Sequence, residues 1–209
     1  MTAYHGGKQR IGKELASVIT DYVSNLSEKT DLSERDIKIN GYCEPFCGML
    51  GVYRHIPDML ESPKAPEGSC LGANAHIKYV ASDINKSLIL MWKESQKGWK
   101  PPSRISKQQF ETLKYDKSYS ALKGFIGFAG TYRGVFFDSY FPHSASKIKH
   151  SAQTVYDIAT DNCKDVKFKH GDYKIWSHES SRAHGGRTKL KNYIIYCDPP
   201  YYGTEQRYY

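Results

Sequence analysis

A short stretch near the end of the chain constrains the fold most strongly. Residues 193–197 read Tyr-Ile-Ile-Tyr-Cys, and Asp198, Pro199, Pro200 and Tyr201 follow directly. A continuous apolar run of this kind is typical of a strand that is buried on both faces of a parallel sheet. The prolines end the strand, because proline cannot donate to a ladder and fixes its own backbone. Asp198 is therefore expected at the carboxyl end of a strand, where open α/β sheets bind their ligands.

The residues after this strand suit the chemistry of an exocyclic amino group. Asp198 and the carbonyl oxygen of Pro199 can each accept a hydrogen bond from the same NH2 group, and Tyr201 offers a face on which a planar ring can stack. Two acceptors draw the amino hydrogens out of conjugation and return a lone pair to the nitrogen, which can then attack an electrophilic methyl group. A rigid structural turn after the strand is the alternative interpretation.

The sequence Asp198-Pro199-Pro200-Tyr201 resembles the catalytic motif of amino-group DNA methyltransferases, which methylate adenine N6 or cytosine N4. The adenine enzymes commonly carry Asp at the first position, and the cytosine-N4 enzymes more often carry Ser. The resemblance implies site-specific methylation of adenine N6 in DNA, with S-adenosylmethionine as the cofactor and the adenine flipped out of the duplex. Methylation of cytosine N4 or of RNA, and a non-catalytic DNA-binding remnant of the fold, are the alternatives.

The beginning of the chain combines glycines with a helical pattern. Two adjacent glycines permit a tight turn, and apolar residues then recur at helical spacing over residues 11–23, before a polar stretch at 24–36 that predicts a loop. A glycine loop that leads into a helix exposes N–H groups that suit an anion, although a simple helix N-terminus would look the same. The element resembles the Gly-Gly-Lys motif that opens the D12 class of adenine methyltransferases. This resemblance implies that the methionine end of the donor is lined by Tyr4, Gly6, Gly7 and Lys8.

Glu-Pro-Phe follows the first predicted strand, at residues 37–43, and precedes a glycine turn and a helix that begins near Val52. Strand, glycine turn and helix form a nucleotide-binding arrangement when the glycines let the backbone approach the ligand. The usual pattern has two glycines one residue apart, whereas here Leu50 lies between two more widely spaced glycines. The motif resembles the first S-adenosylmethionine motif of the same class, which implies donor contacts for Glu44, Phe46 and Gly48.

Another acid follows the second predicted strand, at residues 77–82. Asp83 and Ile84 stand between this strand and a predicted helix that begins near Lys86. A carboxylate at this place can accept hydrogen bonds from ribose hydroxyls, and the alternative role is a cap for the helix. The D12 class has the same Asp-Ile-Asn sequence here, which implies that Asp83 binds the ribose of the donor with Ile84 beside it.

The third predicted strand covers residues 166–170, where apolar and polar residues alternate. By the resemblance, Asp172 and Tyr173 after this strand contact the adenine of the donor. The four motifs stand in the order of the class. They imply an α/β fold with a doubly wound, Rossmann-like class I methyltransferase sheet, in which residues 1–95 and 152–209 form the donor-binding catalytic core.

Residues 96–151 have a different texture, rich in Lys, Tyr, Phe and Gly. The D12 class places its target-recognition region between the second-strand motif and the catalytic motif, so this segment is expected to be a small inserted DNA-recognition subdomain. Its candidate DNA contacts are Tyr132, Arg133, Lys147 and Lys149. A packed subdomain with a basic surface is the alternative.

Composition supports a polyanionic partner. The net charge is +8 and the isoelectric point is about 9.1, which favours double-stranded DNA. Five cysteines without a CxxC pair indicate reduced thiols and no metal site. The chain has no run of 18 apolar residues and no signal-peptide pattern at its start, so we expect no membrane contact and an intracellular location, in a cytoplasmic, nucleoid or viral compartment.

Only eight residues follow Tyr201, whereas the class continues with further strands beyond the catalytic strand. We therefore expect the strand at 193–197 to lie at the edge of the sheet, with the C-terminal strands of the fold missing. An exposed strand edge favours association. The expected partners include a second chain that completes the sheet and, for a site-specific enzyme, a restriction endonuclease counterpart. The chain alone is expected to bind the donor weakly and to methylate DNA poorly.

Overall fold

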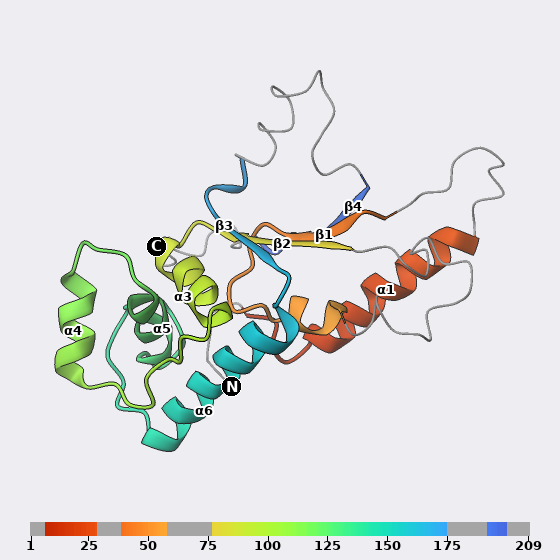
Figure 1. Ribbon diagram of the computed structural model, residues 1–209. Helices are drawn as coiled ribbons and strands as arrows, with labels where there is room; N and C mark the ends of the chain where they lie inside the picture. Colours follow the sequence, from red (N-terminus) through yellow and green to blue (C-terminus); the bar gives the residue numbers. More distant parts are fainter. Residues whose placement is uncertain (1–6, 29–38, 58–76, 175–191, 200–209) are drawn as a thin grey trace.

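The computed structural model describes residues 7–28, 39–57, 77–174 and 192–199 of the 209-residue chain. These residues form an α/β fold with an all-parallel, four-stranded sheet and five α-helices (Figure 1). The strands are β1 (Gly41–Glu44), β2 (Lys78–Asp83), β3 (Lys167–His170) and β4 (Tyr193–Ile195). The helices are α1 (Gly12–Glu28), α3 (Lys86–Gln96), α4 (Lys107–Tyr115), α5 (Ala121–Ala129) and α6 (Ala145–Asp157), with the short 3-10 turn η1 (Tyr53–His55) and the π-helical turn η2 (Ile158–Asn162).

The strand order is β3-β2-β1-β4, so the chain crosses from one side of β1 to the other between β3 and β4. Tyr42 of β1 stands opposite Tyr79 of β2 and Ile194 of β4. Because all the strands are parallel, their carboxyl ends meet at one edge. The order has a topological switch point between β1 and β4, which is where open α/β sheets bind ligands.

β4 lies at the edge of the described sheet, as expected, and pairs only with β1 among the described strands. The prediction that this strand is buried on both faces is wrong. Tyr193 and Ile194 are half-buried, and Ile195 is 48% exposed. Apolar character alone does not distinguish a central strand from an edge strand, because both are rich in Ile and Tyr.

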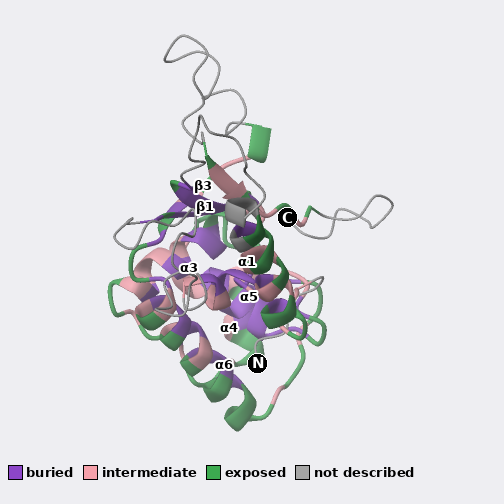
Figure 2. Ribbon diagram, turned by 90° about the vertical axis from the view of Figure 1, so that its right-hand side faces the viewer, coloured by how far each residue is buried: buried purple, intermediate pink, exposed green. Residues whose placement is uncertain are grey.

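The described helices lie on one side of the sheet (Figure 1), so helices on both faces, as in a doubly wound fold, are not seen in these residues. Side chains on the helix-covered face alternate with those on the other, and Tyr42, Tyr79 and Phe168 point into the core from three neighbouring strands. Figure 2 shows the buried residues concentrated where the sheet and the helices meet. No helix in the described ranges is long and apolar enough to cross a membrane.

One predicted boundary was wrong near the beginning of the chain. α1 extends to Glu28, into the stretch at 24–36 that was predicted to be a loop, because a polar sequence without Gly or Pro can continue a helix. The helix predicted from Val52 begins with the 3-10 turn η1, in which the His55 N–H donates to the Val52 carbonyl at 3.0 Å, and the next two residues, 56 and 57, are α-helical. Each predicted strand is present, although β1 covers 41–44 where 37–43 was predicted and β4 ends at 195 where 197 was predicted. β2 covers 78–83 instead of 77–82, and β3 covers 167–170 instead of 166–170.

α3 connects the sheet to the rest of the helices. Asn85 caps it, since its side-chain oxygen accepts a hydrogen bond from the Leu88 N–H at 3.0 Å. α5 packs closely on α3 at Gly124, where an added Cβ would lie 2.2 Å from the Ser87 carbonyl oxygen. α5 therefore packs into the same hydrophobic core as the sheet, although it belongs to the segment at 96–151. α6 begins inside that segment and runs past its predicted end.

Candidate active site

The first described residues and the last described residues meet in an ion pair. The Lys8 ammonium lies 2.6 Å from Oδ2 of Asp198 and donates a hydrogen bond to Oδ1 at 2.8 Å, across 190 positions of sequence. Both side chains are about one-fifth exposed, at 18% and 21%. Two predicted motifs, the Gly-Gly-Lys element and the residues after β4, are thus brought into direct contact.

Glycines let the loop before α1, which contains Lys8, approach the edge of the sheet closely. At Gly12, an added Cβ would lie 1.9 Å from the Gly51 carbonyl oxygen, so no larger residue fits. At Gly51, an added Cβ would lie 3.0 Å from the backbone nitrogen of Gln9. The Arg54 guanidinium then fixes the loop by donating to the Gln9 carbonyl at 3.1 Å. The loop before α1 and the glycine turn after β1 therefore form one packed unit.

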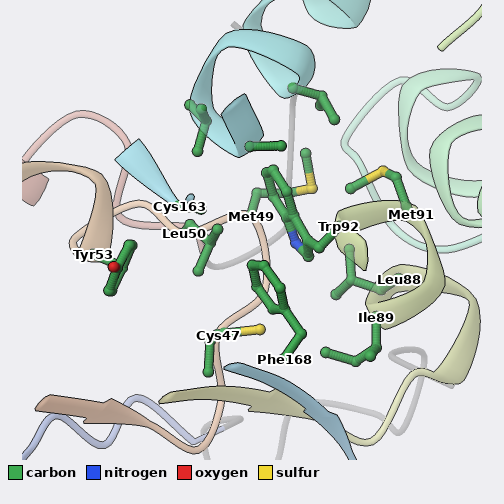
Figure 3. Close-up of a cluster of buried hydrophobic side chains, with 14 of the residues drawn as sticks. Cys47, Met49, Leu50, Tyr53, Leu88, Ile89, Met91, Trp92, Cys163 and Phe168 are labelled. Atoms are coloured by element: carbon green, nitrogen blue, oxygen red, sulfur yellow. The ribbon is translucent and has the colours of Figure 1, made fainter. Parts of the chain in front are cut away.

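The turn after β1 is ordered in spite of its unusual glycine spacing. Gly48 and Leu50 both have positive φ angles, of 44° and 54°. The Gly48 carbonyl accepts a hydrogen bond from the indole Nε1 of Trp92 at 3.0 Å. The backbone N–H of Gly48 donates to Oδ2 of Asp83 at 3.1 Å. Leu50 is fully buried, and Figure 3 shows it with Trp92 and Phe168 in the hydrophobic cluster above the sheet. Core packing holds Leu50 in a conformation that normally favours glycine.

Asp83 occupies the end of β2 as predicted, but its carboxylate is buried and has structural partners. Besides the Gly48 N–H, it accepts the Asn85 N–H at 2.9 Å. Burial raises the pKa of Asp83, and these backbone hydrogen bonds oppose the rise. A carboxylate has about four lone-pair sites, so acceptor capacity remains for a ligand. Ile84 beside it is 42% exposed, and its carbonyl oxygen is bonded by His170 Nε2 at 3.0 Å.

Glu44 lies at the end of β1 and is buried. Its Oε1 accepts a hydrogen bond from the Tyr42 hydroxyl at 2.8 Å. Burial raises the pKa of Glu44 to about 8, the Tyr42 hydrogen bond opposes this rise, and the nearby Asp198 carboxylate adds to it. A cationic group bound beside Glu44 and Asp198 would favour the ionised form of Glu44 and so lower its pKa.

Replacing Glu44 with glutamine should change how stability depends on pH. In the unfolded chain the Glu44 carboxyl loses its proton near pH 4.3, whereas in the folded chain it keeps the proton up to about pH 8. The contribution of protonated Glu44 to the free energy of unfolding is therefore complete at low pH. It is lost as the pH rises to about 8, at up to about 1.4 kcal/mol per pH unit. In urea unfolding between pH 5 and 9, the free energy of unfolding of Glu44→Gln should fall less steeply than that of the wild type. Parallel curves would contradict the assignment.

Two aromatic rings lie near the carboxyl ends of β1 and β3. Phe46, after β1, and Tyr173, after β3, have ring centroids 5.3 Å apart and an interplanar angle of 43°. Tyr173 is 49% exposed, and Phe46 is half-buried. The Asp172 carboxylate beside them is used locally, because it accepts a hydrogen bond from the Lys174 N–H at 2.9 Å. The two rings offer a partly open apolar surface for a planar group.

The predicted DNA contacts lie on other elements. Tyr132 and Arg133 are exposed on the loop after α5, and Lys147 and Lys149 are exposed on α6. Gly7 lies beside Lys8, and Pro199 is exposed next to Asp198. The remaining site predictions fall outside the described residues, namely Tyr4, Gly6, Pro200 and Tyr201.

Sequence reasoning missed three residues that support the site. Tyr42 could have been found from its spacing, because residues two apart on a strand share a face with their side chains adjacent. Trp92 and Arg54 contact the site only through the folded chain, so no local pattern marks them. Within the described ranges, no group of three or more His, Cys, Asp or Glu side chains could hold a metal ion.

No protein-family model matches this chain, and no curated protein matches it in sequence. The geometry of the site and the motifs must therefore carry the functional interpretation.

Proposed function

We propose that this chain is a site-specific DNA adenine-N6 methyltransferase that uses S-adenosylmethionine. The observation that carries the proposal is the Lys8–Asp198 ion pair, which joins the Gly-Gly-Lys element to the Asp-Pro-Pro-Tyr element. This pair lies at the switch point between β1 and β4, where ligands of α/β sheets bind. In this proposal the sheet is of the Rossmann-like class I type, and residues 96–151 recognise the target DNA.

The residues at the sheet edge fit the donor. The cationic part of the donor suits the acid Glu44, its ribose hydroxyls suit the Asp83 carboxylate, and its adenine suits the half-open rings of Phe46 and Tyr173. Gln9 adds an independent sign of an absent ligand, because its side-chain Nε2 is buried and has no hydrogen-bond partner in the described structure. A buried donor of this kind normally has an acceptor, and a carboxylate group would supply one. When bound, S-adenosylmethionine supplies the electrophilic methyl group.

The chain itself orients the amino group to be methylated. Asp198 accepts a hydrogen bond from the exocyclic NH2 of the adenine, and the Pro199 carbonyl accepts the second. Lys8 holds both carboxylate oxygens of Asp198 and so limits the directions in which that carboxylate can point. The chemistry needs no covalent nucleophile, and catalysis is mostly orientation in a polar setting.

Asp83 provides a direct test of the donor site. Asp83→Ala should weaken S-adenosylmethionine binding by about 1–3 kcal/mol, the range for a hydrogen bond to a charged group. Isothermal titration calorimetry measures the affinity, and thermal unfolding verifies that the variant is folded. Asp165→Ala, which removes an exposed acid after η2, is the matched control and should bind the donor normally. Unchanged affinity in a folded Asp83→Ala protein would exclude the proposed role of this residue.

Electrostatic contacts should dominate the affinity for DNA. Each phosphate contact that is lost lowers the slope of log affinity against log salt concentration by about one. Arg133→Ala should therefore lower this slope and weaken DNA binding, without changing the affinity for the donor. Fluorescence anisotropy at several salt concentrations measures the slope. A binding affinity that does not vary with salt would argue against a phosphate-contacting surface.

A further inference from the structure

Half of the apolar pattern of α1 lies outside the core. Four residues spaced four, three and four positions apart share one face of the helix, and we call them the α1 stripe: Ile11, Leu15, Val18 and Tyr22. Val18 and Tyr22 are each 64% exposed, and Ile11 is 49% exposed. Leu15 is half-buried and packs against the edge of the core. Apolar side chains that follow one another along a helix differ from the scattered single residues that are normal at a surface.

The described fold packs a different face of α1 into the core. The residues on that face are Gly12, Ala16 and Val23, which are buried, and Ile19, which is partly buried against the core. Among the described elements, α1 packs mainly on η1, and Figure 1 shows it at the opposite end of the layer of helices from α4 and α5. Figure 2 shows exposed residues along α1. The α1 stripe is therefore contiguous with the core, and the described elements leave it open to solvent.

Two acids border the α1 stripe on the side away from the core. Glu14 and Asp21 are seven residues apart, each one position before a member of the stripe, so they form a row along it. Both side chains are exposed, and neither has an ion pair in the part of the chain that the structure describes. α1 holds three acids and one base, Lys13, although the whole chain has a net charge of +8. This border repels a polyanion, such as DNA or an anionic membrane, and attracts a basic partner.

We propose that the α1 stripe docks an amphipathic helix of a partner protein, with Lys or Arg residues at the border of its apolar face. The stripe is about 17 Å long, which corresponds to roughly three turns of a facing helix. Helices pair through apolar stripes of this spacing, and the charges at the borders select the partner and its orientation. The basic residues of the partner lie opposite Glu14 and Asp21.

A second copy of the chain fits the α1 stripe less well than a basic helix does. Two α1 helices packed antiparallel through their stripes would bring the two rows of acids together, and like charges at such positions destabilise a helix pair. The inference uses no residue of the candidate active site, and it does not depend on the proposed function.

Two designed peptides probe the chemistry of the partner. Both are amphipathic helices of three heptads with the same leucine face, and they differ only in carrying Lys or Glu at its borders. Binding of each labelled peptide to the whole chain is followed by fluorescence anisotropy. The wild type should bind the Lys peptide at least about 5-fold more tightly than the Glu peptide at low salt, and the difference should shrink as added salt screens the charges.

Variants of the stripe and its border locate the binding surface. Val18→Ser and Tyr22→Ser should each weaken binding of the Lys peptide by about 10-fold, because each removes an apolar contact from the docked face. Glu14→Lys combined with Asp21→Lys should reverse the preference in favour of the Glu peptide. Tyr115→Ser is the control, since it changes a tyrosine of α4 that is 76% exposed, and it should bind both peptides like the wild type.

Several outcomes would overturn the inference. They are no binding of the Lys peptide, equal affinity of the wild type for the two peptides, binding that Val18→Ser and Tyr22→Ser leave unchanged, and a preference that the double charge reversal leaves unchanged. Sedimentation velocity measures self-association, and a wild-type dimer that Val18→Ser dissociates would identify a second copy as the occupant and refute the basic helix. Thermal unfolding verifies that each variant is folded.

Discussion

Asp198→Ala should reduce methyl transfer to DNA by at least about 100-fold, because removal of one aligned catalytic hydrogen-bonding group typically lowers kcat by about 10²–10³. Asp198 is 21% exposed and packs in no apolar cluster, so the variant should remain folded. The loss should fall on the chemical step, and single-turnover transfer of a labelled methyl group measures that step directly.

Two further variants separate the role of the carboxylate from that of its charge. Asp198→Asn keeps one acceptor oxygen and should retain more transfer than Asp198→Ala. Lys8→Met leaves Asp198 in place without its ion pair, and should lower the rate by less than Asp198→Ala does. Full activity of a folded Asp198→Ala protein would rule out the mechanism.

Trp92→Ala should lower the free energy of unfolding by about 3–5 kcal/mol, the usual cost of truncating a buried large aromatic residue. Trp92 is fully buried and stacks on Phe168, with ring centroids 6.0 Å apart and an interplanar angle of 8°. It also bonds the Gly48 carbonyl, so it connects α3, β3 and the turn after β1. Urea unfolding monitored by far-UV circular dichroism measures the change.

Trp92→Phe distinguishes packing from the hydrogen bond. This variant keeps most of the ring but leaves the Gly48 carbonyl without its donor, at a cost of about 1–3 kcal/mol. It should also weaken S-adenosylmethionine binding more than its modest destabilisation suggests, because the glycine turn contributes to the donor site. Wild-type stability and donor affinity in Trp92→Phe would show that the indole hydrogen bond to the Gly48 carbonyl stabilises neither the fold nor the donor site.

Local sequence patterns located the strands and the acids at their ends. Glu44 and Asp83 are the last residues of β1 and β2, and Asp198 follows β4, so all three lie at strand ends of one parallel sheet, as predicted. Apolar runs that stop at Pro, Gly or Asp mark strand ends well. The contact between Lys8 and Asp198 was not predicted, since no local pattern relates residues 190 positions apart. The motif resemblance implied only that each of them belongs to the site. Their contact depends on the close approach at Gly12 and Gly51.

Other features depend on tertiary packing and could not be predicted. Val52 and Ile56 are both buried on either side of the 3-10 turn η1, and from this turn Arg54 reaches the Gln9 carbonyl. The buried state of Glu44, and therefore its raised pKa, follows from the layer of side chains above β1. The exposure of Ile195 depends on which neighbours β4 has in the sheet.

The most direct test of the proposed function is to follow a labelled methyl group. The chain, in excess over a random-sequence DNA library, is incubated with S-adenosylmethionine that carries a deuterated methyl group, and the nucleosides are then analysed by mass spectrometry. An RNA pool is treated in parallel, and Asp198→Ala is the control. We predict labelled N6-methyladenine in the DNA, dependent on Asp198. Label in cytosine N4 or only in RNA would contradict the proposed substrate, and no label at all from a folded, donor-binding protein would contradict the proposed enzyme.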